Sequence, residues 1–179
     1  MNRASTGHLG RSGFTLVELM LVVVLMSIVA ASVIPALGNV QAMREGAARD
    51  DIVRYLEIAK ARAMASGMPC GLEVDMSSSS LTMVCIDDAG SVETLIDPLT
   101  ADQRSLEIPT TYGGVTLDSF SGGSALSASG VVWFDFEAKP HTRSSDGTFV
   151  ALNSSAVTLE LSSQQRIVVH PYSGVIETP

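Results

Sequence analysis

Few residues of this chain have the types and spacing that chemistry requires. One carboxylate, Glu18, lies near the start of an apolar stretch that carries no further charge until Arg44. The two cysteines, Cys70 and Cys85, allow one disulfide bond at most. The sequence has no Gly-x-Ser-x-Gly nucleophile elbow, no glycine-rich phosphate loop and no His-Glu-x-x-His metal signature. We therefore expect that the protein is not an enzyme and that it has no catalytic residue, metal site or cofactor.

A weaker candidate group consists of Asp135, Glu137 and His141. The two acids share one face of an expected strand, but a single strand supplies too few ligands for a metal ion, so a solvated acidic face is the preferred interpretation. His141 and His170 each lie next to a proline near the end of an expected strand. We predict that both histidines are on the surface and that neither is a general base.

The residues around Glu18 form a distinctive pattern. A leader that contains Arg3 and Arg11 but no acid ends in Gly13-Phe14-Thr15-Leu16-Val17-Glu18, and Leu19–Leu37 is long enough to cross the hydrocarbon core of a bilayer. A lone carboxylate in lipid costs roughly 2.5–3.5 kcal/mol near the bilayer centre, so it is a functional candidate. The alternatives are a secretory signal, a simple anchor, or a Glu18 side chain that reaches the interface.

This pattern resembles the class III signal of type IV pilins and of the pseudopilins of type II secretion. The resemblance implies that a prepilin peptidase cuts after Gly13 and methylates the new amino terminus on Phe14, so residues 1–13 are a cleaved leader. It also implies that Glu18 compensates the Phe14 ammonium of a neighbouring subunit, because such a pair is strong in a low dielectric. Pro35 fits the same resemblance, and we expect it to kink the helix.

The first part of the chain is expected to be one long helix with two halves. Residues 14–38 form the hydrophobic half, which is a transmembrane and filament-core helix. Residues 39–67 form an amphipathic half, because Ile52, Leu56, Ala59 and Ala63 recur at helical spacing on one face. A stop is predicted at Gly67 and Pro69.

Residues 68–179 are expected to form a β-rich periplasmic globular domain, because the apolar period changes to two. Two hairpins are predicted, and so is a strand at 131–137 with Val132, Phe134 and Phe136 on one face. Shorter strands are expected at 106–108, 115–117 and 149–152. In the hairpin of 70–76 with 81–87, Cys70 and Cys85 are either directly opposite or diagonal neighbours, and they are either bridged or remain two buried thiols. The second hairpin pairs 157–161 with 166–170.

The charge and composition of this body restrict its partners. Residues 67–179 carry four basic and fourteen acidic side chains, a net charge of −10, so a nucleic-acid partner is not expected. Residues 113–130 are rich in glycine and serine and are predicted to be a surface loop, either a partner-docking loop or a solvated connector.

Three segments of the body resemble one branch of the same family, which contains general secretion pathway protein H and the FimT and FimU minor pilins. They are EIAKARAMASGMP, VVWFDFEAKPHT and VTLELSSQQRIVVHPYSGVIET. The resemblance implies an α+β, pilin-like fold with a long helix packed on antiparallel β-sheet. It implies a minor pseudopilin of the bacterial inner membrane, single-pass, with other major and minor pseudopilins at a filament tip as its partners. The alternatives are a minor type IV pilin and an anchored periplasmic binding module that never polymerises.

Overall fold

A computed structural model describes residues 15–97, 101–122, 124–126, 129–162 and 164–179; of these, the side chains of 32–39, 124–126 and 129 are not described. The chain divides into two compact units, one that ends at Val40 and one that comprises Gln41–Pro179. The helix α1 (Leu16–Ser66) contributes residues to both units. It ends directly before Gly67, as the sequence predicts.

In the second unit, the residues of α1 that were predicted to form the apolar face are all buried. Ile52, Leu56, Ala59 and Ala63 are at most 1% exposed, and Ala48 extends the stripe by one turn. Burial of such a stripe stabilises a helix more than its intrinsic propensity does. The prediction of an amphipathic second half is therefore confirmed at these positions.

The rest of this unit consists of two antiparallel sheets and a short helix, α2 (Ile108–Thr111). The path of the eight-stranded sheet is β3 (Val92–Thr94), β2 (Ser80–Ile86), β1 (Cys70–Asp75), β7 (Ser129–Phe134), β8 (Pro140–Arg143) and β9 (Phe149–Leu152). Off this path, β4 (Ser105–Glu107) pairs with β2, and β6 (Ser124–Leu126) pairs with β7. The four-stranded sheet has the order β12 (Ile176–Glu177), β11 (Arg166–Val169), β10 (Val157–Leu161) and β5 (Leu117–Ser121). The predicted α+β class, a long helix with an antiparallel sheet body, is confirmed.

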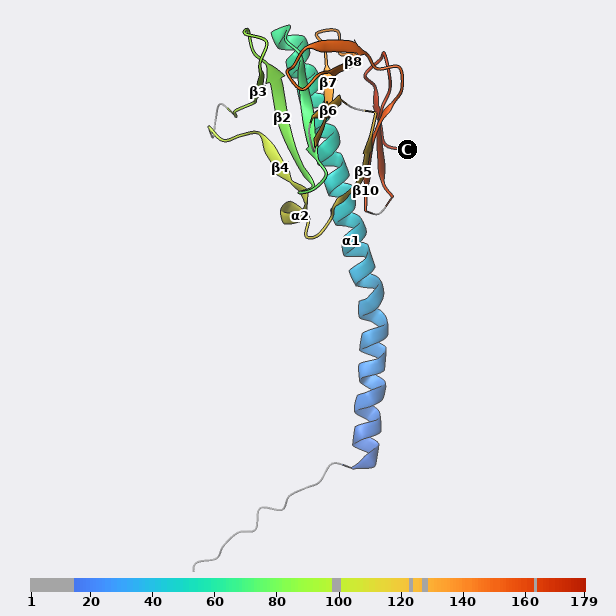
Figure 1. Ribbon diagram of the computed structural model, residues 1–179. Helices are drawn as coiled ribbons and strands as arrows, with labels where there is room; N and C mark the ends of the chain where they lie inside the picture. The colour runs from blue at the N-terminus through green and yellow to red at the C-terminus, as the bar shows by residue number, and fades with distance from the viewer. Residues whose placement is uncertain (1–14, 98–100, 123, 127–128, 163) are drawn as a thin grey trace, which may run out of the picture. The chain divides into compact units, whose positions relative to one another are not determined.

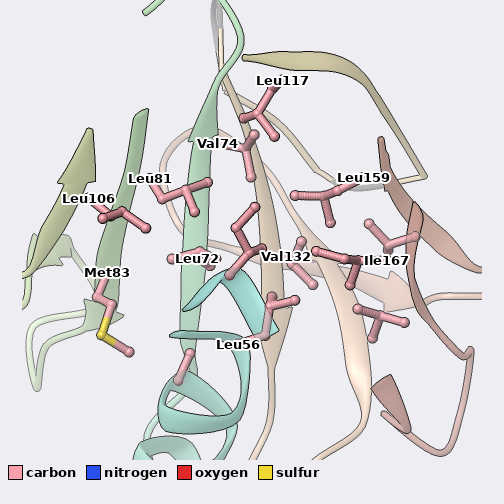
Figure 2. Close-up of a cluster of buried hydrophobic side chains, with 14 of the residues drawn as sticks. Leu56, Leu72, Val74, Leu81, Met83, Leu106, Leu117, Val132, Leu159 and Ile167 are labelled. Atoms are coloured by element: carbon pink, nitrogen blue, oxygen red, sulfur yellow. The ribbon is translucent and has the colours of Figure 1, made fainter. Parts of the chain in front are cut away.

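The main core lies where the inner faces of both sheets meet the buried stripe of α1 (Figures 1 and 2). Leu56 of α1 lies among Leu72 and Val132 of one sheet and Leu159 and Ile167 of the other. Strand β10 shows why the sequence period of two predicts this arrangement, because its apolar residues are buried and alternate with half-buried polar ones. Burial of each large aliphatic side chain contributes about 1.5–3 kcal/mol.

The prediction of a strand at 131–137 is wrong at its C-terminal end. Strand β7 stops at Phe134, and the chain then turns through residues 135–138. Phe136, which was placed on the same face as Val132 and Phe134, is 62% exposed, whereas those two residues are buried. Trp133, on the opposite face, is 1% exposed because that outer face is also covered.

The prediction of a surface loop at 113–130 is also wrong for most of the residues described there. Strand β5 lies inside this segment and pairs with β10, with Phe120 opposite Leu159 and Leu117 opposite Leu161. Leu117 is buried in the main core. The glycine and serine residues on either side of β5 give this segment the composition of a flexible linker. It nevertheless forms a strand because it pairs with β10.

A close approach between β1 and β7 leads to a stability prediction for Gly71. A Cβ atom at this position would lie 2.5 Å from the carbonyl oxygen of Val132 and 3.0 Å from Cε3 of Trp133. Because backbone cannot move aside as a side-chain tip can, Gly71→Ala is expected to lower the free energy of unfolding by about 1–3 kcal/mol. Gly46→Ala in α1 is the matched control, since nothing lies within 4 Å there. Gly46→Ala is expected to raise the free energy of unfolding by about 1 kcal/mol. Urea titration of both variants measures the two changes.

A second prediction concerns Tyr112, which follows α2 and donates its phenolic hydrogen to Asp51 of α1. Burial and this carboxylate raise the pKa of Tyr112 from 10.0 to about 12. The contribution of this contact to the stability of the folded chain is therefore complete below pH 10.0 and is lost as the pH rises through about 12. Ultraviolet titration of the phenols should show one ionisation near pH 12 that Tyr112→Phe removes. The variant should lose about 1 kcal/mol of stability at neutral pH; a titration curve without that late step would contradict the contact.

Candidate functional site

The start of α1 holds Glu18 in a reciprocal pair of contacts with Thr15. The backbone N–H of Thr15 donates to Oε2 of Glu18 at 3.3 Å, and the backbone N–H of Glu18 donates to Oγ1 of Thr15 at 3.2 Å. This is a capping box, which satisfies backbone donors that the first turn of a helix leaves free. This capping box was not predicted, although Thr15 three positions before Glu18 is its sequence signature.

Three residues of the predicted site cannot be placed. Gly13 and Phe14, the predicted cleavage and methylation positions, lie outside the described residues. The side chain of Pro35 also lies outside them, within a stretch of α1 that is helical throughout. Cleavage, methylation and the kink therefore stay predictions.

The first part of α1 exposes its large apolar side chains, among the residues that the structure describes. The large apolar residues between Leu16 and Val29 are 43–75% exposed. An uninterrupted apolar surface of this kind marks a contact with lipid or with other protein. Within the described residues, no helix is both long and apolar enough to cross a membrane. The membrane-spanning role predicted for residues 14–38 therefore stays a proposal.

In the β1–β2 hairpin, Cys70 and Cys85 are directly opposite in register and are joined by a disulfide bond. Their Cα atoms are 4.0 Å apart. Of the two registers that the sequence left open, the structure has the one with the cysteines face to face. Cys70 lies against the main core, and no cysteine has a free thiol. The disulfide bond thus links the two strands of the hairpin at the end that follows α1.

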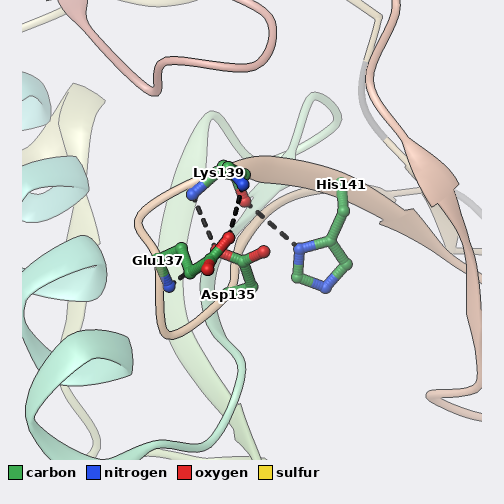
Figure 3. A network of polar contacts seen from close by, with 4 residues as sticks. All are labelled: Asp135, Glu137, Lys139 and His141. Carbon is green, nitrogen blue, oxygen red and sulfur yellow. Dashed lines mark hydrogen bonds and ion pairs between the residues drawn. The ribbon is translucent and has the colours of Figure 1, made fainter.

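The acidic group predicted around the β7–β8 turn serves the turn itself (Figure 3). Asp135 Oδ1 accepts hydrogen bonds from the backbone N–H groups of Glu137 and Lys139, at 2.9 and 2.8 Å. The carboxylate of Glu137 pairs with the ammonium of Lys139. No group of three potential metal ligands occurs among the residues that are described.

The two histidines of the body differ in position. His170 is half exposed and its Nε2 lies 2.8 Å from Oε2 of Glu177. His141 is 1% exposed, so the prediction of a surface histidine is wrong there. The physical reason is that β9 pairs with β8 and brings the Phe149 ring to 5.6 Å from the imidazole. Nothing in the sequence near His141 indicates that a later strand covers it.

Comparison with known proteins identifies the region that contains Glu18. A family model described as a prokaryotic N-terminal methylation motif matches residues 9–34. The chain carries a prepilin-type methylation motif. Its predicted cleavage position, Gly13, and its lone acid, Glu18, both lie within the matched range.

The chain also has distant structural likenesses. No curated protein matches the chain. Two solved structures of the minor pseudopilin EpsH from the type 2 secretion system of Vibrio cholerae are similar to it. One has 14% sequence identity and a TM-score of 0.46, over 75% of this chain and 94% of that chain. The other has 18% identity and a TM-score of 0.45, over 74% and 89%. These two likenesses carry no argument about function.

Proposed function

We propose that this chain is a minor pseudopilin, a structural subunit of the type II secretion pseudopilus that helps to move folded exoproteins across the outer membrane. We propose that its role is structural and that it is not an enzyme. A prepilin peptidase cuts after Gly13 and methylates Phe14. The mature chain is then held in the inner membrane by residues 14–38, with residues 68–179 in the periplasm.

The observation that carries this proposal is the combination of motif and exposed helix. The methylation motif covers residues 9–34, and the large apolar side chains of α1 from Leu16 to Val29 are 43–75% exposed. A soluble enzyme or a soluble binding module has no use for such a surface, whereas a subunit that packs its helix among other helices does. The three body segments resemble general secretion pathway protein H and also the FimT and FimU minor pilins, so the choice of type II secretion over a pilus rests on the test below.

The chemistry of assembly follows from two charges. Removal of the leader creates an ammonium on Phe14, and an unpaired charge is costly inside a bundle of apolar helices. The carboxylate of Glu18 in an adjacent subunit compensates it, and the pair sets the axial position of one subunit on the next. The capping box holds the Glu18 carboxylate at the first turn of α1.

Deletion of the gene in its native host tests the proposal. We expect exoproteins to accumulate in the periplasm while pili and twitching motility remain intact. Loss of twitching with normal secretion would instead support the minor type IV pilin. A chain recovered with its leader intact, or cut beyond the apolar stretch, would contradict a filament subunit of either kind; mass spectrometry of the amino terminus distinguishes these cases.

A further inference from the structure

The outer face of the eight-stranded sheet carries a small second apolar cluster, separate from the main core. It consists of Val84, Ile86, Val131 and Trp133, all buried, with Val92 packed beside them. A sheet face that points away from the main core is buried only if another segment covers it. Trp133 is the only tryptophan of the chain, and its Nε1 is buried without a hydrogen-bond partner among the described residues.

The covering segment is the β8–β9 hairpin. At its turn, Gly147 is buried so closely against the cluster that a Cβ there would lie 3.0 Å from Cδ1 of Ile86 and 3.3 Å from Cγ2 of Val92. The guanidinium of Arg143 lies 5.9 Å from the centroid of the Trp133 ring and also donates to the carbonyl oxygen of Gly147. Arg143 thus links the hairpin turn to the tryptophan.

A hydrogen bond to a neighbour on its own strand helps to hold Arg143 in this position. The Nε–H of Arg143 donates to Nε2 of His141 at 2.8 Å. An imidazole nitrogen that accepts a hydrogen bond carries no proton, so His141 is neutral and its other nitrogen, Nδ1, faces the carbonyl oxygen of Lys139 at 3.4 Å (Figure 3). A proton on Nε2 would place two donors face to face and a second positive charge beside Arg143.

The surroundings of His141 oppose that proton. Its ring is buried, and the charged groups that face it are Arg143 on its own strand, which disfavours protonation, and Asp135 at the end of β7, which favours it. Strand β9 contributes the uncharged Phe149 and Leu152. Burial is the main cause that lowers the pKa of His141 from 6.5, and Arg143 adds to it.

We propose that the β8–β9 hairpin is an acid-released flap, in which protonation of His141 breaks its hydrogen bond with Arg143 and uncovers the apolar cluster around Trp133. In the released form the cluster is exposed to water, and Trp133 Nε1 gains water as a hydrogen-bond partner. The flap is a property of the body and does not depend on the proposed role in secretion.

The direction of the pH dependence follows from linkage. In the open form His141 is in water and binds a proton more readily than in the closed form. The closed form is therefore fully favoured above pH 6.5, and its advantage falls as the pH drops below that value. The open fraction rises by up to about tenfold per pH unit, until His141 is protonated in the closed form as well.

The single tryptophan makes this measurable in the full-length chain in detergent micelles. As the pH falls from about 7.5 to about 4.5, the emission of Trp133 should shift to longer wavelength and acrylamide should quench it several-fold more strongly. His141→Gln keeps an acceptor for Arg143 and cannot be protonated, so its emission should not change over this range. His170→Gln, which removes the other histidine of the body, should respond as the unchanged chain does.

Two outcomes would overturn the flap. The first is an acid response of the same size and midpoint in His141→Gln. The second comes from hydrogen exchange on the unchanged chain, which keeps the test decisive if that variant fails to fold. After correction for intrinsic rates, protection at low pH should fall in β8 and β9 while β10 and β11 remain protected. Unchanged protection in β8 and β9, or an equal loss in all four strands, would contradict the proposal.

Discussion

Glu18→Gln is expected to prevent incorporation of this chain into filaments while its body stays folded. The variant removes the negative charge that compensates the Phe14 ammonium of an adjacent subunit. An uncompensated buried charge costs about 3–5 kcal/mol, so docking should weaken more than a hundredfold. The measurement is the fraction of chain that sediments with, or cross-links to, the other pseudopilins in the native host.

The capping box makes glutamine more informative than alanine at this position. Glutamine at the third helical residue still accepts a hydrogen bond from the helix start, so Glu18→Gln keeps the cap and removes only the charge. Thr15→Ala is the converse control, because it removes a capping hydroxyl at about 1 kcal/mol and keeps the carboxylate. We expect Thr15→Ala to assemble. Normal assembly of Glu18→Gln together with failure of Thr15→Ala would show that Glu18 acts through helix capping and not through charge pairing.

The second large effect is expected from the disulfide bond between Cys70 and Cys85. It closes a loop of 15 residues, which stabilises the folded chain by about 3 kcal/mol through the lost freedom of the unfolded state. The double variant Cys70→Ala, Cys85→Ala should therefore lower the free energy of unfolding by that amount. Urea titration, followed by the fluorescence of Trp133, gives the value.

Reduction of the unchanged chain provides the matched control. A reductant should lower its stability as far as the double variant and should leave the double variant unaffected. Thiol counts on protein purified and unfolded without reductant should be zero, and should rise to two after reduction. Two reactive thiols before reduction would show that the bridge is absent in the cell, and the hairpin would then depend on its strand pairing alone.

Where a residue's structure depends on near neighbours in sequence, the sequence was sufficient to predict it. The buried face of α1 follows from apolar residues at helical spacing, and the end of the helix follows from Gly67. The β1–β2 and β10–β11 hairpins follow from apolar alternation on both sides of a short polar turn. The methylation motif is likewise one continuous segment, residues 9–34, whereas the assembly role of Glu18 stays a prediction.

Predictions failed where a distant segment provides the cover. Alternation along residues 131–137 correctly separates Trp133 from Val132, but it cannot show that the β8–β9 hairpin folds back over the outer face. His141 was expected on the surface for the same reason, since the later strand β9 helps to enclose it. Local composition likewise could not show that β5 pairs with β10.

The sequence by itself determined the helix with its lone acid, the hairpins and a choice of two registers for the cysteines. Tertiary structure alone decided that Cys70 faces Cys85, that both faces of the larger sheet are covered, and that a histidine lies neutral between Arg143 and Phe149. The physical reason is that periodicity records only which side of an element avoids water. The segment that excludes the water, and the polar groups it brings, depend on contacts between strands far apart in the chain.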